Sequence, residues 1–371
     1  MIRKFTLLFS LTVLIFSGSA QEILPSNCYM QLSGSIHKEI LLNMNMVKVG
    51  DSLYGDYTVL ANEAGKNTKC GEIGQPRQFF GKINQKGKLW IKTWPGDQGF
   101  IFNGQFKKTR GMTGICESKP GNGKKLSFEL AEKFPEGGIR FNPYILKDHK
   151  KLLKDPKSPQ ASIRMVLLAP VFDSNYCCSD TIRRIMFGRF ADNQDNQISP
   201  ENLLSDVRKD FFDNYMKDNA SIYKEMPGAS FAWELLRYTH IISNENNKLT
   251  FYIISYSFTG GAHGQSSQVF TTVDLKSGKV LTPADLFKTG FEADLTRLLT
   301  QKLHHMTNLA DSRKLTESGY FVDEIKPNNN FFLNANGIGF LYNQYEIAPY
   351  SFGQTEIFMT MEELKSLLKT P

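Results

Sequence analysis

The chain has 371 residues, of which 41% are hydrophobic and 12% aromatic, and its 44 Lys and Arg face 37 Asp and Glu. Such a length and apolar content suit about two domains with real cores and exclude a disordered chain, while 5 Cys are too few for a disulfide-stapled mini-protein. The net charge of +7 is small and is not gathered into a basic stripe, so no nucleic acid is expected as a partner.

The first twenty residues have the features of an export signal. Arg3 and Lys4 are followed by an apolar stretch over residues 5–16 and by small residues at 18–20, the pattern of a cleavage site. The apolar stretch is short for a membrane span, so an uncleaved anchor is the less favoured alternative. We expect a signal peptide at 1–20, a mature protein that is periplasmic or secreted, and no membrane span after cleavage.

Export makes disulfides possible, and an odd number of cysteines leaves at least one thiol free or paired between chains. Cys70 and Cys116 lie in or beside predicted strands, and we predict a bridge between them. The adjacent Cys177 and Cys178 are not expected to bridge each other, because that geometry is strained. Zinc is a weaker alternative, since no C-x-x-C or H-x₃₋₅-H spacing is present. We predict no metal and no cofactor.

Residues 21–135 predict an all-β module. Short runs rich in β-branched and aromatic residues alternate with turns of Gly, Asn and Lys at intervals of about ten residues, which is typical of an antiparallel barrel or sandwich. Small barrels either fill their interior with side chains or hold one ligand. The aromatic residues that would line such a pocket are Trp90, Trp94, Phe100, Phe102 and Phe106. Plain core is the commoner role for such residues.

Several motifs of this region resemble a lipocalin-like β-rich module of exported bacterial proteins. They are G-S-I at 34–36, L-Y-G-D-Y at 53–57, F-N-G-Q-F at 102–106 and G-K-K-L-S-F at 123–128. The resemblance implies a small barrel. Cys116 stands where that family often has Trp, which implies different packing at this corner.

Residues 136–160 interrupt the strand pattern and predict a linker, because they combine two glycines, several prolines and a cluster of lysines. Residues 161–371 then mix strands and helices. Ser199 and Pro200 supply a helix start, a hydroxyl N-cap followed by proline, and the strand runs 231–242, 249–258 and 265–274 come next. We predict an α+β domain with an antiparallel sheet, and thus an α+β fold overall with an all-β module at its N-terminal end.

An ordered set of motifs in the second half resembles the extracytoplasmic domain shared by the RsiV anti-sigma factor and the PdaC deacetylase. The set includes Y-S-F-T-G-G-A-H-G at 256–264, F-T-T-V-D-L at 270–275, L-T-P-A-D-L-F at 281–287 and Y-E-I-A-P-Y at 345–350. Signalling in that family needs a transmembrane helix and a cytoplasmic segment, and deacetylation needs T-F-D-D-G and H-x₃-H motifs, none of which is found here. The resemblance therefore implies an envelope-facing recognition domain.

The segment 259–264 is the most site-like part of the chain. Its two glycines allow positive φ and exposed amides, and His263 is placed to bind or titrate. The alternative is a tight strand connection whose histidine bonds to a backbone carbonyl. The predicted binding residues are Tyr256, Thr259, Gly260, Gly261, His263, Tyr345, Glu346 and Tyr350.

The sequence thus favours an envelope-facing binding protein without catalytic residues, which recognises a peptidoglycan fragment or a wall-directed protein such as lysozyme. Two alternatives stay open. One is a hydrolase or deacetylase of envelope polymers that uses His263 and nearby carboxylates, and the other is a carrier of a small apolar ligand in the β-rich module.

Overall fold

The computed structural model describes residues 24–62, 73–93, 100–108, 110–118, 123–173, 176–191, 197–226 and 231–369. The predicted signal peptide, Cys70 and Trp94 lie outside these residues. No helix in the described part of the chain combines the length and the apolar character that a bilayer crossing requires.

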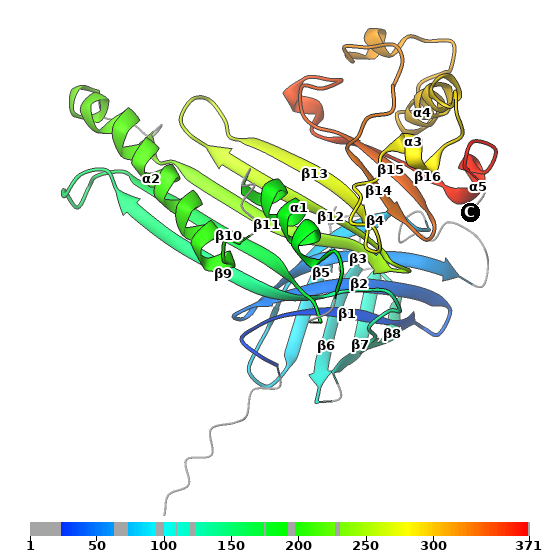
Figure 1. Cartoon of the computed structure of the whole chain (residues 1–371), viewed down its shortest axis with the longest axis horizontal. Helices are drawn as coiled ribbons and strands as arrows, with labels where there is room; N and C mark the ends of the chain where they lie inside the picture. The colour runs from blue at the N-terminus through cyan, green and yellow to red at the C-terminus, as the bar shows by residue number, and fades with distance from the viewer. Residues whose placement is uncertain are drawn as a thin grey trace, which may run out of the picture.

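Eight strands form a closed antiparallel barrel, as predicted for the first module (Figure 1). They are β1 (Asn27–Ile36), β2 (Ile40–Val49), β3 (Ser52–Asn62), β4 (Pro76–Ile83), β5 (Lys88–Thr93), β6 (Phe100–Lys107), β7 (Gly111–Ser118) and β8 (Lys125–Glu132). Each strand pairs with the next in the chain, and β1 pairs with β8 to close the ring.

Side chains fill the barrel interior. Phe100, Phe102 and Phe106 are buried, and Phe102 packs edge-on against Phe128 with ring centroids 5.2 Å apart. Burial of one such ring contributes about 1.5–3 kcal/mol, so these aromatic residues are a major part of the core. Trp90 was expected beside them, but it points outward and is 40% exposed. The pocket-lining role is therefore wrong for Trp90, and the three phenylalanines serve as core.

A five-stranded sheet follows the barrel, in the order β13-β12-β11-β10-β9. Its strands are β9 (Arg140–Lys151), β10 (Gln160–Val171), β11 (Glu234–Glu245), β12 (Lys248–Phe258) and β13 (Gln265–Asp274). All neighbours are antiparallel except β10 and β11, which are parallel. A parallel pair needs a crossover connection, and two helices, α1 (Ser179–Ala191) and α2 (Pro200–Glu225), make it here.

Strand β9 corrects the linker prediction for residues 136–160. Residues 140–151 pair along their whole length with β10, as the edge strand of the sheet. An edge strand tolerates Pro143 and carries exposed lysines that discourage pairing with other chains, and these residues gave the sequence its linker-like character.

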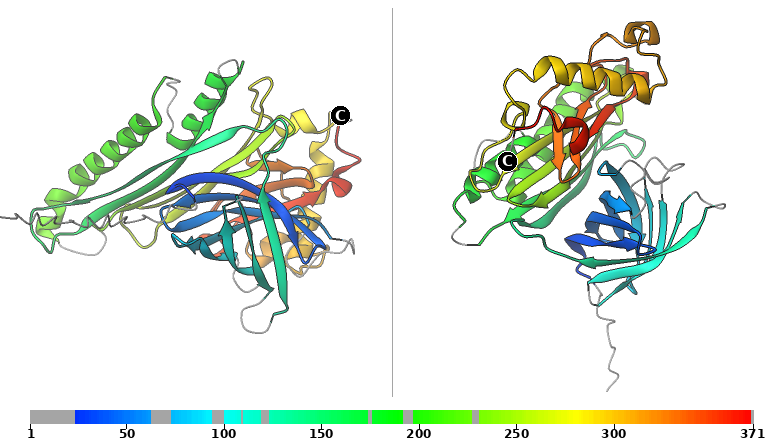
Figure 2. Two further views of the ribbon diagram at one scale, coloured as in Figure 1. Left: turned by 90° about the horizontal axis from the view of Figure 1, so that it is seen from below. Right: turned by 90° about the vertical axis from the view of Figure 1, so that its right-hand side faces the viewer.

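Helices α1 and α2 cover one face of this sheet (Figure 2). The predicted N-cap is confirmed, since Asn202 N–H donates to Ser199 Oγ at 3.1 Å. Buried Ile163 and Met165 of β10 belong to the same core as Phe187 of α1 and Tyr215 of α2. The opposite face of the sheet is turned toward the barrel.

A three-stranded sheet completes the molecule, with β15 between β14 and β16. Its elements are β14 (Phe331–Asn334), β15 (Gly337–Tyr342) and β16 (Thr355–Thr360), with helices α3 (Pro283–Leu286), α4 (Glu292–Met306) and α5 (Met361–Leu364) and the 3-10 turns η2 (Leu315–Ser318) and η3 (Tyr350–Phe352). Buried Leu295, Leu299 and Leu303 of α4 share a core with this sheet.

Candidate functional site

Two loops that are distant in the sequence meet beyond the ends of β12 and β15. The ring of His263 stacks on the ring of Tyr350, with centroids 3.9 Å apart and an interplanar angle of 24°. The Tyr350 hydroxyl donates to the carbonyl oxygen of Gly264 at 2.9 Å, and the Tyr345 ring lies 5.8 Å from the Tyr350 ring. Three residues from two separate sequence motifs, His263 from one and Tyr345 and Tyr350 from the other, are therefore neighbours in space.

The backbone of the first loop explains its glycines. Gly260 and Gly261 have φ values of 99° and 91°, as the sequence predicts for this turn. Gly264 is buried under the Tyr256 ring, and a Cβ at position 264 would overlap that ring. Tyr256 is thus a support beneath the turn, while Thr259 and Gly261 are exposed on it.

The second loop carries an unusual conformation at an exposed aromatic residue. Tyr345 has a φ of 68°, although it has a side chain, and its N–H donates to the Ala348 carbonyl at 3.1 Å. Non-glycine residues with positive φ are uncommon and concentrate at functional sites. Glu346 is exposed on the same turn and accepts a 3.4 Å hydrogen bond from Asn343 Nδ2.

Further aromatic side chains lie on adjoining segments. Phe321 N–H donates to the Ile347 carbonyl at 2.8 Å, and Phe352 packs edge-on against Tyr320. The exposed fractions of Tyr345, Phe321 and Phe352 are 52%, 54% and 43%. We define the aromatic surface as His263, Phe321, Tyr345, Tyr350 and Phe352.

Grouped exposed aromatic residues mark interaction sites on soluble proteins, because exposure of so much apolar area has no benefit to the fold. The sequence analysis missed Phe321 and Phe352. The signal available for both was an aromatic residue within two positions of a loop glycine, at Gly319 and Gly353.

His263 has a defined set of contacts. Its Nδ1 lies 3.0 Å from the Gly264 carbonyl oxygen, which requires that Nδ1 carries the proton. A neutral ring then presents Nε2 as an acceptor. This bond to a backbone carbonyl is the one that the alternative in the sequence analysis, a tight strand connection, predicts. The side chain is also exposed, so a ligand can reach it.

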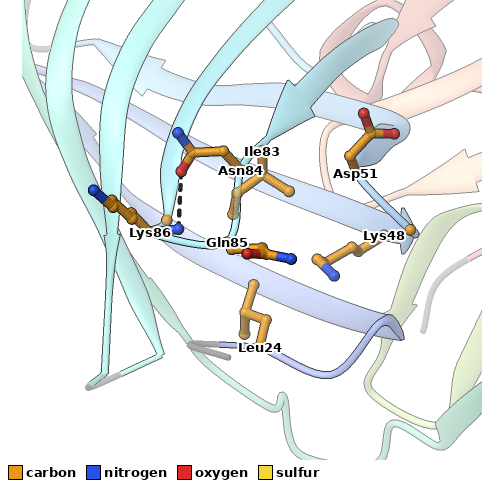
Figure 3. A pocket seen from close by; sticks show the side chains of 9 residues that line it. Leu24, Lys48, Asp51, Ile83, Asn84, Gln85 and Lys86 are labelled. Atoms are coloured by element: carbon orange, nitrogen blue, oxygen red, sulfur yellow. Dashed lines mark hydrogen bonds between the residues drawn. The ribbon is translucent and has the colours of Figure 1, made fainter. Parts of the chain in front are cut away.

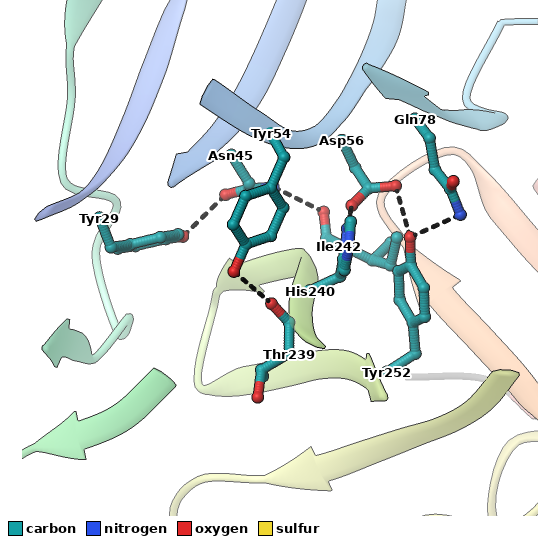
Figure 4. Close-up of polar contacts among 9 residues, drawn as sticks. All are labelled: Tyr29, Asn45, Tyr54, Asp56, Gln78, Thr239, His240, Ile242 and Tyr252. Carbon is teal, nitrogen blue, oxygen red and sulfur yellow. Dashed lines mark hydrogen bonds and ion pairs between the residues drawn. The ribbon is translucent and has the colours of Figure 1, made fainter. Parts of the chain in front are cut away.

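A second polar constellation lies buried where the barrel meets the sheet (Figure 4). Asp56 of β3 accepts hydrogen bonds from His240 Nδ1 at 2.6 Å and from the Tyr252 hydroxyl at 3.0 Å. Gln78 Nε2 of β4 donates to the same hydroxyl at 3.0 Å, and His240 stacks on Tyr252. Asp56 and His240 are only 3% and 7% exposed. The polar groups of Asp56, His240 and Tyr252 are therefore hydrogen-bonded within the protein.

Further polar contacts lie on either side of this group. Asn45 Nδ2 of β2 donates to the Ile242 carbonyl at 3.1 Å, and Asn244 exchanges hydrogen bonds with the backbone of Ile139 at 2.8 and 2.9 Å. Gln75 donates to Glu356 of β16 at 3.0 Å, where burial raises the pKa of the Glu356 carboxyl to about 7. The barrel is thus attached to both sheets by polar contacts that are buried or partly buried.

The sequence contains one signal for this junction. His240 stands within a buried-type strand run, and Asp56 within another, and a polar residue in such a run requires a partner. Nothing in the sequence identifies which partner it is.

A hollow of about 580 Å³ lies at one end of the barrel, between the β2–β3 and β4–β5 turns (Figure 3). Lys48 Nζ at this hollow donates to the carbonyl oxygens of Pro25 and Ser26 at 2.8 and 3.2 Å. The ammonium group of Lys48 therefore holds the chain that enters β1.

The described residues contain no cluster of three or more His, Cys, Asp or Glu side chains arranged to hold a metal ion. Cys116 is buried in the barrel core, and its predicted bridge to Cys70 stays a prediction because Cys70 is outside the described residues. The sulfur atoms of Cys177 and Cys178 are 3.4 Å apart and not bonded, as expected.

Two family models match the second half of the chain. Residues 178–266 match the family described as Deacetylase PdaC, and residues 284–362 match a family described as Protein of unknown function (DUF3298). The resemblance derived from the motifs is confirmed, and both regions are typical of extracytoplasmic proteins. His263 belongs to the first region and Tyr345 and Tyr350 to the second, so the aromatic surface is built from both.

One of two similar solved structures shows the same fold over part of the chain. A DUF3298 family member from Bacteroides fragilis is 24% identical and superposes with a TM-score of 0.59, over 63% of this chain and 96% of that one. A DUF3298 family protein from Pseudomonas aeruginosa is 17% identical, with a TM-score of 0.43 and the same coverage of 63% and 96%. No curated protein matches the chain.

Proposed function

We propose that this protein is an exported binding protein of the cell envelope that recognises a cell-wall glycan on its aromatic surface. The observation that carries the proposal is the group of exposed rings around the His263–Tyr350 stack, held in place by backbone hydrogen bonds. A sugar ring has a face of C–H bonds that packs on such rings, and its hydroxyl groups bond to polar atoms around them.

The expected location of the protein outside the cytosol supports this ligand class. The first twenty residues have the composition of a signal peptide, and the matched families are typical of extracytoplasmic proteins. Outside the cytosol, a protein with a fixed aromatic surface has access to cell-wall glycan.

The contacts of His263 favour recognition over catalysis. The name of one matched family, Deacetylase PdaC, raises deacetylation as the rival. A histidine that acts as a general base is usually oriented by a carboxylate or an equivalent group. In the described residues the contacts of His263 are a backbone carbonyl and a tyrosine ring.

The test is calorimetric titration of the mature protein with soluble peptidoglycan fragments. We expect binding in the micromolar range, weakened about tenfold or more by His263→Ala and by Tyr345→Ala, which corresponds to about 1.4 kcal/mol. Phe134→Ala is the matched control, because Phe134 is an exposed aromatic residue (42%) on a different part of the molecule.

The proposal fails if no fragment binds more tightly than millimolar, or if all three variants bind like the wild type. Binding of lysozyme with the same sensitivity to the variants, in the absence of glycan binding, would identify a protein ligand instead. Release of acetate from the fragments that His263→Ala abolishes would replace recognition by the deacetylase alternative.

A further inference from the structure

A cleft of about 700 Å³ separates the outer wall of the barrel from the sheet face that carries no helices. Tyr54 and Phe80 line it on the barrel side, and Ile145, Tyr238 and Ile254 line it on the sheet side. Its volume is within the range of small-molecule sites, and its walls are mainly apolar, as in such sites. The cleft shares no residue with the aromatic surface.

Two cations stand side by side on the sheet wall of this cleft. Lys147 of β9 and Arg164 of β10 are directly opposite each other across the two strands, and both are exposed. Like charges in this position destabilise a sheet. Among the described residues no carboxylate forms an ion pair with either of them, whereas Lys82 on the barrel wall pairs with Asp51 at 3.1 Å. The sheet wall therefore has positive charge that an anion would compensate.

The barrel wall contributes an exposed apolar group. Phe80 of β4 is 45% exposed, and its ring packs edge-on against Trp90 of β5 at a centroid distance of 5.9 Å. Phe80 lines a cleft whose other wall contains Ile145 and Ile254. The apolar area and the two cations lie within one cavity.

We propose that this cleft binds a small amphipathic anion, with its carboxylate or phosphate on Lys147 and Arg164 and its apolar part against Phe80 and the facing isoleucines. Arginine suits this role because its planar group binds such anions through two parallel hydrogen bonds. The inference goes beyond the proposed recognition of glycan, since it concerns a different site and a different class of ligand.

The experiment titrates the mature protein with dodecanoate and with dodecyl phosphate below their micellar concentrations, followed by calorimetry and by tryptophan fluorescence. Dodecanol and dodecylamine test the need for the negative charge, and acetate tests the need for the chain. We expect one or both anions to bind at least tenfold more tightly than these three compounds, and the tighter of the two identifies the head group.

The variant Lys147→Gln/Arg164→Gln should weaken binding of the anion about tenfold or more, and Phe80→Ala should weaken it severalfold. Arg184→Gln/Lys276→Gln is the matched control, because both residues are exposed cations that do not line the cleft. Without ligand the first double variant should unfold at the same temperature as the wild type or higher, since it removes a repulsion, so a loss of binding is not a loss of the fold.

The inference is overturned if dodecanol and dodecylamine bind as tightly as the anions, if the cleft double variant binds like the wild type, or if neither anion binds. His263→Ala and Tyr345→Ala should leave anion binding unchanged. The two sites can therefore fail separately.

Discussion

The molecule contains the same pair of side chains twice, in opposite surroundings. His240 stacks on Tyr252 at the barrel–sheet junction, with centroids 4.6 Å apart and an angle of 28°, and His263 stacks on Tyr350 at the surface, at 3.9 Å and 24°. The first histidine is 7% exposed and donates to a buried carboxylate, that of Asp56. The second is exposed and bonds to a backbone carbonyl.

Under the proposed function, surroundings rather than residue types divide the structural role of His240 from the binding role of His263. A buried imidazole beside a buried carboxylate must be fully hydrogen-bonded, so the His240 stack is tied to the barrel and joins two parts of the fold. An exposed stack has little effect on folding and keeps its outer face available to a ligand. Three substitutions test this division.

The largest effect is expected at the junction. His240→Ala removes the closest donor to Asp56, leaves that carboxylate buried with Tyr252 as its remaining partner in Figure 4, and opens a space beside Tyr54. Removal of one partner of a buried pair usually costs about 3–5 kcal/mol. We expect a decrease of this size in the free energy of unfolding, measured by urea denaturation with circular dichroism.

The double variant His240→Ala/Asp56→Asn is the control for this explanation. It removes the buried charge together with its partner, so it should be less destabilised than the sum of the two single variants. If the free energy of unfolding of His240→Ala is within about 1 kcal/mol of the wild-type value, the junction does not depend on the His240–Asp56 pair.

A smaller effect, dependent on pH, is expected at Glu356. Burial raises the pKa of this carboxyl from 4.5 to about 7, the Asp56 carboxylate raises it further, and Gln75 and Arg77 oppose the shift. The folded state thus binds a proton that the unfolded state has released between about pH 4.5 and 7, so stability falls as pH rises through this window. The loss amounts to about 3 kcal/mol, since one pKa unit corresponds to about 1.4 kcal/mol.

Glu356→Gln should remove that loss, because an amide does not ionise and can still bond to Gln75. We expect the variant to unfold like the wild type at pH 4.5 and to be more stable than the wild type at pH 8, as measured by thermal unfolding at both pH values. Glu346→Gln, at an exposed carboxylate, should show no such difference. If the difference in stability between Glu356→Gln and the wild type is the same at both pH values, the raised pKa of Glu356 is contradicted.

Local patterns allowed much of the fold to be predicted. Alternation of apolar residues with glycine turns indicated the barrel, and Ser199–Pro200 indicated the start of α2, because both signals depend on neighbouring residues only. The edge strand β9 was missed because its lysines and Pro143 serve its exposed position. The parallel pairing of β10 with β11 was missed because two helices separate these strands in the sequence.

The candidate site divides along the same line. His263 and Tyr350 were predicted through motifs, although their loops are 86 residues apart at the Tyr350–Gly264 contact. His240 and Asp56 are 184 residues apart in the sequence, and no motif contains both of them. Periodicity indicates that a residue is buried, but it does not identify the residue across the interface.

The smallest effect on stability is expected from His263→Ala. The largest is expected from His240→Ala, so the two variants make the same change of residue type at different positions. The ring is exposed, its hydrogen bond is to a backbone carbonyl at 3.0 Å, and Tyr350 keeps its own bond to Gly264 without it. Substitutions at such positions usually change the free energy of unfolding by no more than about 0.5 kcal/mol. Urea denaturation of His263→Ala beside His240→Ala measures the contrast directly. Equal destabilisation by the two variants would mean that the exposed stack also supports the fold, and the aromatic surface would then lose its distinction from the junction.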